Sequence, residues 1–111
     1  LAGEHEQLDD QEAADEHARK ALRLLEGRED FLDEIGQSNL VLGRSLLERD
    51  RLDEAEQCFR AADQAFEQME SVAHRTGGWV AMGDLAERRG NAREAARWYR
   101  NAAEALSVVR F

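Results

Sequence analysis

At positions 79–86 the chain reads Trp79-Val-Ala-Met-Gly83-Asp-Leu-Ala86, and 40 residues earlier it reads Asn39-Leu-Val-Leu-Gly43-Arg-Ser-Leu46. Behind each stretch the same offset relates an alanine, an aromatic residue and a second alanine. These are Ala55, Phe59 and Ala62, matched by Ala95, Tyr99 and Ala102. In a fainter copy upstream, Ala14, Ala18, Ala21 and Leu25 precede Ala55, Phe59, Ala62 and Phe66 by 41 residues. The chain is therefore built from repeated units.

The composition indicates that these units are helical. The 111 residues include no proline and are rich in alanine, leucine, glutamate and arginine, which favour helix. A glycine on one helix and an alanine on the next let the two helices approach closely, and the aromatic residue fills the remaining space. One such pair cannot bury its apolar face alone, so we expect pairs to stack.

This pattern resembles the tetratricopeptide repeat. Trp79, Met82, Gly83, Ala95, Tyr99 and Ala102 match its signature, and the first copy departs from it at Asn39. The period is also longer than the family's, and the terminal proline is missing. The resemblance implies an all-α, right-handed superhelical array of antiparallel helix pairs, that is, an α-solenoid fragment. Similar elongated repeats occur in the sensor regions of bacterial transcription regulators.

We expect one domain, residues 1–111, with a partial repeat at 1–27 and repeats at 28–70 and 71–111. The chain begins with Leu1, so we also expect it to be a piece of a longer protein. Capping residues divide it further: Asp9 or Asp10, Asp30 and Ser71 suit helix N-termini, whereas Gly27 and Gly90 suit helix ends. The predicted helices are a tail at 1–7, a helix from there to Leu25, one from Asp30 to about Arg49, and helices 52–70, 71–89 and 92–109.

Charge restricts the classes of partner. The chain has 24 acidic and 15 basic residues, a net charge of −9, and residues 1–35 alone hold 12 acids and 4 bases. We expect a cytoplasmic segment that binds neither membrane nor nucleic acid. Arg89, Arg93, Arg97 and Arg100 form a stripe that could grip phosphates, but a solvated face explains it better. Four pairs at helical spacing predict ion pairs: Asp15–Arg19, Glu16–Lys20, Glu56–Arg60 and Asp84–Arg88.

No motif predicts an enzyme, a metal site or a cofactor. His5, His17 and His74 lack another histidine at helical spacing. No serine or threonine lies at a strand-to-helix elbow beside a histidine. Cys58 precedes Phe59 on a core-facing helix, where a small buried hydrophobic residue is the simpler interpretation than a reactive thiolate.

A surface remains. The family resemblance implies that one face of each first helix lines a groove for a protein or peptide. That face holds Gln37, Leu40, Arg44, Leu47 and Glu48, then Gly77, Val80, Asp84, Glu87 and Arg88. Leu40 and Leu47 either contact an apolar ligand or pack on another helix, and Arg44 and Asp84 are placed to form an ion pair. We therefore expect non-catalytic protein or peptide binding within a larger regulatory protein, such as a helix-turn-helix transcription regulator.

The alternative is a structural oligomerisation segment whose groove binds nothing. Apolar residues cover a wide arc of the last helix, and nothing later in this chain covers its outer part. We expect this part to contact either a second copy of the chain or a segment missing from it, and we favour self-association, a homodimer through the C-terminal helix. The residues are Trp98, Ala105, Val109 and Phe111.

Overall fold

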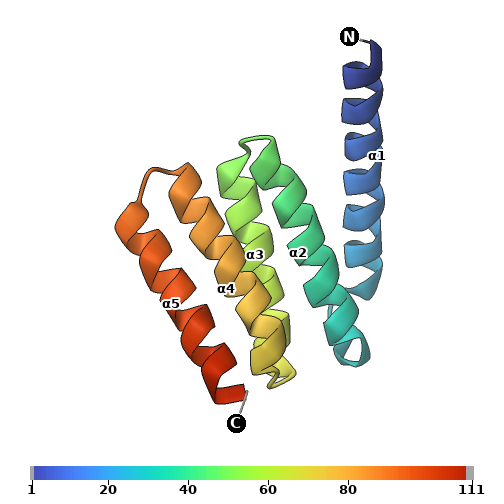
Figure 1. The fold of residues 1–111 in the computed structure, drawn as a ribbon. Coiled ribbons are helices and arrows are strands. Elements are labelled where there is room, and N and C mark those ends of the chain that lie inside the picture. Colours follow the sequence, from blue (N-terminus) through green and yellow to red (C-terminus); the bar gives the residue numbers. More distant parts are fainter. Residues whose placement is uncertain (1, 110–111) are drawn as a thin grey trace.

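The structure is a computed structural model that describes the backbone of residues 2–109 and the side chains of residues 10–107. Its elements are α1 (Ala2–Leu25), the 3-10 helix η1 (Glu29–Phe31), α2 (Leu32–Glu48), α3 (Leu52–Gln68), α4 (Val72–Arg88) and α5 (Ala92–Val109). The described backbone is all-helical, as predicted, and contains no strand. Figure 1 shows α2 to α5 side by side and the longer α1 at the edge of the group. None of the described helices is both long enough and apolar enough to cross a membrane.

A spacing of 20 residues organises α2 to α5. The helices α2, α3 and α4 each contain 17 residues, and helices begin at residues 32, 52, 72 and 92. Each turn contains one residue with a left-handed backbone: Asp50 (φ 60°), Glu70 (φ 57°) and Gly90 (φ 77°). Two units of helix plus turn therefore account for the 40-residue offset in the sequence.

The three turns close with the same pair of backbone hydrogen bonds. After α2, the amide of Asp50 donates to the carbonyl of Leu47 (3.0 Å), and that of Arg51 donates to Leu46 (2.9 Å). This arrangement satisfies carbonyls that the helix end would otherwise leave open. The equivalent bonds are Glu70 to Glu67 and Ser71 to Phe66 after α3, and Gly90 to Glu87 and Asn91 to Ala86 after α4.

Consecutive helices pack on one another, and α2 also touches α4. Glycine–aromatic contacts hold the pairs α2–α3 and α4–α5 together. A Cβ at Gly43 would lie 2.5 Å from the Phe59 ring, and one at Gly83 would overlap the ring of Tyr99. Phe59 is fully buried, as predicted, whereas Tyr99 is half-buried because its hydroxyl reaches the surface carboxylate of Asp84.

Two predicted helix starts are wrong. Residues 2–25 form one continuous helix, because the acidic pair Asp9–Asp10 lies within residues 4–25, which contain neither proline nor glycine. Asp30 lies in η1, and the residue that precedes α2 is Phe31, with no side-chain cap. The cap at Ser71 is confirmed: its hydroxyl accepts from the amide of His74 at 3.3 Å.

Candidate binding surfaces

The side chains predicted to line a groove lie on α2 and α4. Leu47 is only 6% exposed and belongs to the hydrophobic core, and Leu40 packs against that core. A Cβ at Gly77 would meet Leu40 at 3.5 Å, which is ordinary contact. Of the two interpretations of these leucines, packing on other helices is therefore the one the structure shows. Gln37, Glu48, Glu87 and Arg88 are exposed, and Arg44, Val80 and Asp84 are half-buried.

Polar contacts tie these two helices together. The predicted pair is confirmed: Arg44 Nη1 lies 3.2 Å from Asp84 Oδ2. The hydroxyl of Tyr99 donates to the other oxygen of Asp84 at 2.5 Å, and this hydrogen bond raises the pKa of Tyr99 above its ordinary value. Arg88 donates to the carbonyl of Leu47 at 3.1 Å and pairs with Asp50 at 2.7 Å. The α2–α4 face is thus a fixed polar surface.

Three of the four ion pairs predicted within single helices do not form, and in two of them the side chains pair with residues of another helix or turn instead. Asp84 and Arg88 pair elsewhere as described, and so do Asp15 and Arg19. Glu56–Arg60 forms as predicted, at 3.2 Å. Glu16–Lys20 is absent from the ion pairs of the described side chains.

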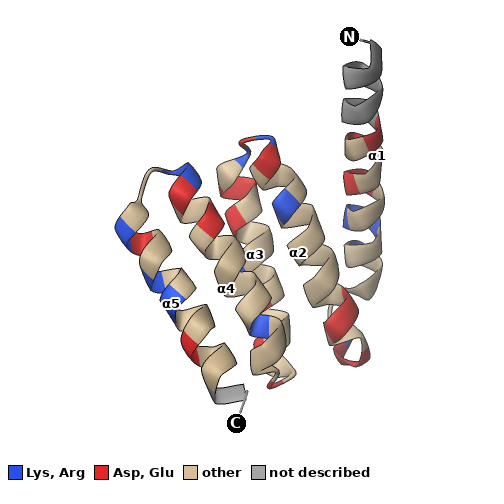
Figure 2. Ribbon diagram, viewed as in Figure 1, with Lys and Arg blue, Asp and Glu red and all other residues tan. Residues whose placement is uncertain are grey.

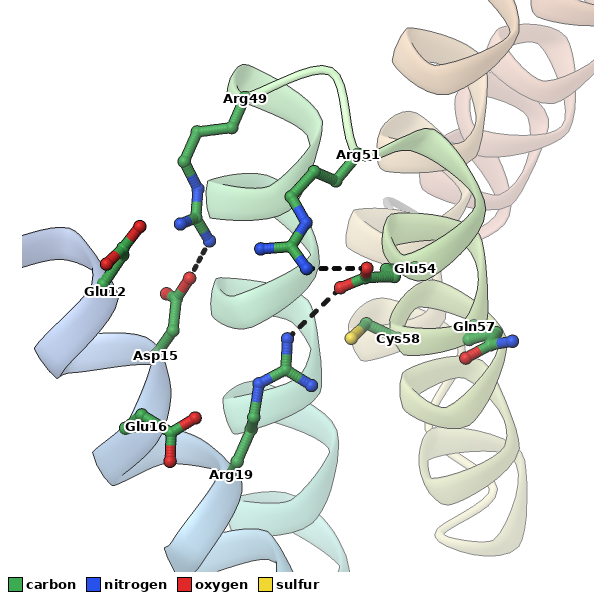
Figure 3. Close-up of a pocket in the computed structure, with 9 residues that line it drawn as sticks. All are labelled: Glu12, Asp15, Glu16, Arg19, Arg49, Arg51, Glu54, Gln57 and Cys58. Atoms are coloured by element: carbon green, nitrogen blue, oxygen red, sulfur yellow. Dashed lines mark hydrogen bonds and ion pairs between the residues drawn. The ribbon is translucent and has the colours of Figure 1, made fainter. Parts of the chain in front are cut away.

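A cleft between α1 and α3, with α2 as its floor, was not predicted from the sequence. Its largest cavity, about 630 Å³, is shown in Figure 3. Side chains from α1 form one wall, α3 forms the other, and Arg49 and Arg51 reach in from the turn after α2. The nine lining residues are Glu12, Asp15, Glu16, Arg19, Arg49, Arg51, Glu54, Gln57 and Cys58.

Two further cavities lie beside α3. One of about 290 Å³ shares Arg19, Gln57 and Cys58 with the first and has Asn39 and Leu42 of α2 as its floor. The other, about 560 Å³, lies near the turn that joins α1 to α2, between Glu26 and Gly27 on one side and Ala61 to Gln68 on the other. We refer to the three cavities together as the α1–α3 cleft.

The three arginines that line the large cavity are paired with carboxylates. Arg49 and Asp15 form a largely buried ion pair between α1 and the end of α2. Glu54 is held by Arg51 at 2.8 Å and by Arg19 at 3.4 Å, and the hydrogen bond from Arg51 lowers the pKa of that carboxyl. These contacts brace α1, which touches the other helices less extensively than α2 to α5 touch one another, against α2 and α3.

Burial raises the pKa of the Cys58 thiol, so the group is protonated at neutral pH. His74 stacks on Phe66 with ring centroids 5.1 Å apart and lies 3.5 Å from Asp33, and His17 is exposed. The side chain of His5 lies outside the described residues. Among the described side chains, no group of three or more His, Cys, Asp or Glu residues could hold a metal ion.

A smaller cavity of about 220 Å³ lies between α3 and α5, with α4 as its floor. Trp79, Met82 and Trp98 line it. Nearby on α5, Ala105 is half-buried and Leu106 is 51% exposed. Arg93, Arg97 and Arg100 are exposed, whereas Arg89 pairs with Asp53 and Glu56. The predicted self-association residues Val109 and Phe111 lie outside the described side chains.

Comparison with protein families, curated proteins and solved structures finds no match to this chain.

Proposed function

We propose that this chain is a non-catalytic module that binds a protein or peptide, built as a superhelical array of the tetratricopeptide type. One observation carries the proposal. The pairs α2–α3 and α4–α5 close around the same contact, Gly43 with Phe59 and Gly83 with Tyr99, at the 40-residue offset of the sequence repeat. Equivalent contacts at equivalent positions are what stacking of like units requires.

The α2–α4 face is the proposed binding surface. The ion pair between Arg44 and Asp84 fixes its centre, while exposed Gln37, Glu48 and Glu87 leave its edges open to a ligand. By resemblance, the parent protein is a cytoplasmic regulator with a DNA-binding helix-turn-helix domain, and this segment is its sensor part. The segment itself makes no contact with nucleic acid in this proposal.

Selection from a displayed peptide library tests the surface. The binding of peptides selected on the wild-type chain is measured again on the double variant Glu48→Lys/Glu87→Lys. The control is Glu104→Lys, because Glu104 is exposed on α5, away from the α2–α4 face. We expect loss of binding in the double variant and none in the control. Selected peptides that bind all three proteins equally would contradict the proposed surface.

The alternative, an oligomerisation segment, has one observation in its favour. Leu106 is 51% exposed on α5, where half-buried Trp98 and Ala105 lie nearby along the helix. Sedimentation at micromolar concentration distinguishes the two. A dimer that Leu106→Glu dissociates would support self-association, and a monomer whose Trp98 already emits as a buried indole would contradict it.

A further inference from the structure

We propose that the α1–α3 cleft is a second binding site, separate from the α2–α4 face, and that it takes a positively charged peptide segment carrying one large apolar or aromatic side chain. The side chain enters between Asn39 and Cys58, and the cationic residues meet the acidic rim. Three observations carry this inference: the unequal filling of two equivalent clefts, the length of the open one, and the sign of its rim.

The two clefts occupy equivalent positions in the repeat. In the second, between α3 and α5, the indoles of Trp79 and Trp98 and the side chain of Met82 line a cavity of about 220 Å³. Forty residues earlier stand Asn39, Cys58 and Leu42, which line the cleft between α1 and α3. Two small side chains thus replace two tryptophans. The cavity that these residues line measures about 290 Å³, and it adjoins at Cys58 the cavity of about 630 Å³. The chain fills one cleft with its own aromatic residues and leaves the other open.

The open cleft is long enough for a peptide. Its lining follows α1 from Glu12 towards the helix end at Leu25, about 20 Å at the rise of an α-helix, and reaches Gly27 in the turn beyond. An extended segment of about seven residues spans that distance. Leu32 and Ile35 of α2 and Ala61 and Ala65 of α3 make the lower part apolar, so the site combines an apolar floor with polar walls.

The charges favour a cationic segment. Five arginines line the cleft, and four of them pair with carboxylates. Arg49 pairs with Asp15, and Arg19 and Arg51 share Glu54. Arg28 pairs with Asp30, and the fifth arginine, Arg23, is exposed. The rim adds further acids at both ends, which are Glu12, Glu16, Glu26 and Glu29, all exposed. Figure 2 shows acidic segments around the middle of α1, basic ones further down the helix, and acidic ones again near the turn into α2. Complementary charge would speed association and exclude anions.

A panel of short synthetic peptides tests the site on the whole chain. The peptides carry a central tryptophan or alanine flanked by lysines, serines or glutamates, and binding is followed by fluorescence anisotropy, with inorganic phosphate as a competitor. We expect the lysine-flanked tryptophan peptide to bind best and the central alanine to cost about thirtyfold in affinity, as truncation of an aromatic anchor does. Binding of the glutamate peptide or of phosphate in preference would overturn the proposal.

Filling the cleft is the sharper test. In Asn39→Trp/Cys58→Trp the first repeat acquires the tryptophans of the second, so we expect an unchanged helical circular dichroism spectrum and a loss of peptide binding of at least about thirtyfold. If that variant does not fold, alkylation of Cys58, the only cysteine, gives a second readout, since bound peptide should slow it. Undiminished binding by the filled variant, or alkylation at the same rate with and without saturating peptide, would overturn the site.

Charge variants separate this site from the proposed function. The double variant Glu12→Lys/Glu16→Lys should lower the affinity for the lysine-flanked tryptophan peptide by about tenfold, because two rim charges change sign. Glu48→Lys/Glu87→Lys, the test of the α2–α4 face, should leave its affinity unchanged. The opposite result, with loss in the α2–α4 variant and none in the cleft variant, would place the peptide on the other face and refute the cleft.

Discussion

Arg44 on α2 and Asp84 on α4, 40 residues apart in the chain, form an ion pair with 3.2 Å between nitrogen and oxygen. The two residues hold equivalent positions in successive repeats, so the pair joins one repeat to the next. Tyr99 donates to the same carboxylate from α5 at 2.5 Å. One side chain, Asp84, therefore links three helices.

A double-mutant cycle measures the pair. The side chains are 43% and 37% exposed, so Arg44→Ala and Asp84→Ala should show a coupling energy of about 0–1 kcal/mol in urea denaturation. Asp84→Ala alone should cost more than Arg44→Ala, because it also removes the acceptor of Tyr99. If Arg44→Ala costs as much in the Asp84→Ala background as in the wild type, the pair contributes nothing.

Substitution by alanine should have opposite effects on the stability of the chain at Gly43 and at Gly78. Alanine at Gly43 would place a Cβ 2.5 Å from the Phe59 ring, and we expect a net loss of about 1–2 kcal/mol after the gain in helix propensity. Alanine at Gly78 meets nothing within 4 Å, and the better propensity should stabilise the chain by about 1 kcal/mol. Thermal denaturation of both variants checks this. Equal shifts would mean that the Gly43 contact is not tight.

Phe59→Ala should destabilise the chain by about 3–5 kcal/mol, because Phe59 is 0% exposed and its removal leaves a cavity between α2 and α3. Val41, on the same pair of helices but 67% exposed, is the control, and Val41→Ala should change the unfolding free energy by less than about 0.5 kcal/mol. A near-neutral melting shift for Phe59→Ala would contradict the repeat assignment.

We predict that the folded chain loses stability at alkaline pH because of Tyr99, its only tyrosine. The hydrogen bond to Asp84 raises the pKa of its hydroxyl above the ordinary 10.0, so the folded chain keeps the proton that the unfolded chain releases. The stabilisation is complete below about pH 10 and is lost as the pH rises from there through the folded pKa. Tyr99→Phe should remove this slope from the unfolding free energy, and tyrosinate absorbance should appear only with unfolding. Ionisation of the folded wild type near pH 10 would disprove the contact.

Glu70 and Gly90 occupy equivalent turns, and both have a left-handed backbone. Glu70→Gly removes the steric cost of a side chain in that conformation and should stabilise the chain by about 1 kcal/mol, whereas Gly90→Ala should destabilise it by a similar amount. Denaturant midpoints give both values. A loss of stability in Glu70→Gly would mean that its side chain makes a contact of greater value than the strain.

The repeat could be read from the sequence because its contacts are made by equivalent residues. Glycine facing an aromatic ring recurs at a fixed offset. The capping and turn residues placed α3, α4 and α5 to within one or two residues. Short-range capping rules worked where a serine precedes a helix, at Ser71, and failed where acidic residues are abundant, at Asp9, Asp10 and Asp30.

Contacts between helices of different repeats were harder to predict. Arg44–Asp84 could be predicted because both positions are equivalent. Asp15–Arg49 joins α1 to the end of α2 across 34 residues, and only its arginine has an equivalent, Arg89, whose partners Asp53 and Glu56 lie at other positions of the repeat. The α1–α3 cleft could not be predicted from the sequence for a related reason. Its only signal is the contrast of Asn39 and Cys58 with Trp79 and Trp98, and that contrast acquires meaning once the helices are known to be neighbours.

The placement of the two tryptophans also determines what spectroscopy can observe in this protein. Trp79, Trp98 and Tyr99 all belong to α4 and α5, so the chromophores that dominate ultraviolet emission lie in the C-terminal half of the sequence. A partly unfolded form that kept α3, α4 and α5 would emit like the native chain while its helical ellipticity fell. Coincident melting curves from fluorescence and circular dichroism would therefore demonstrate that the helices unfold as one cooperative unit.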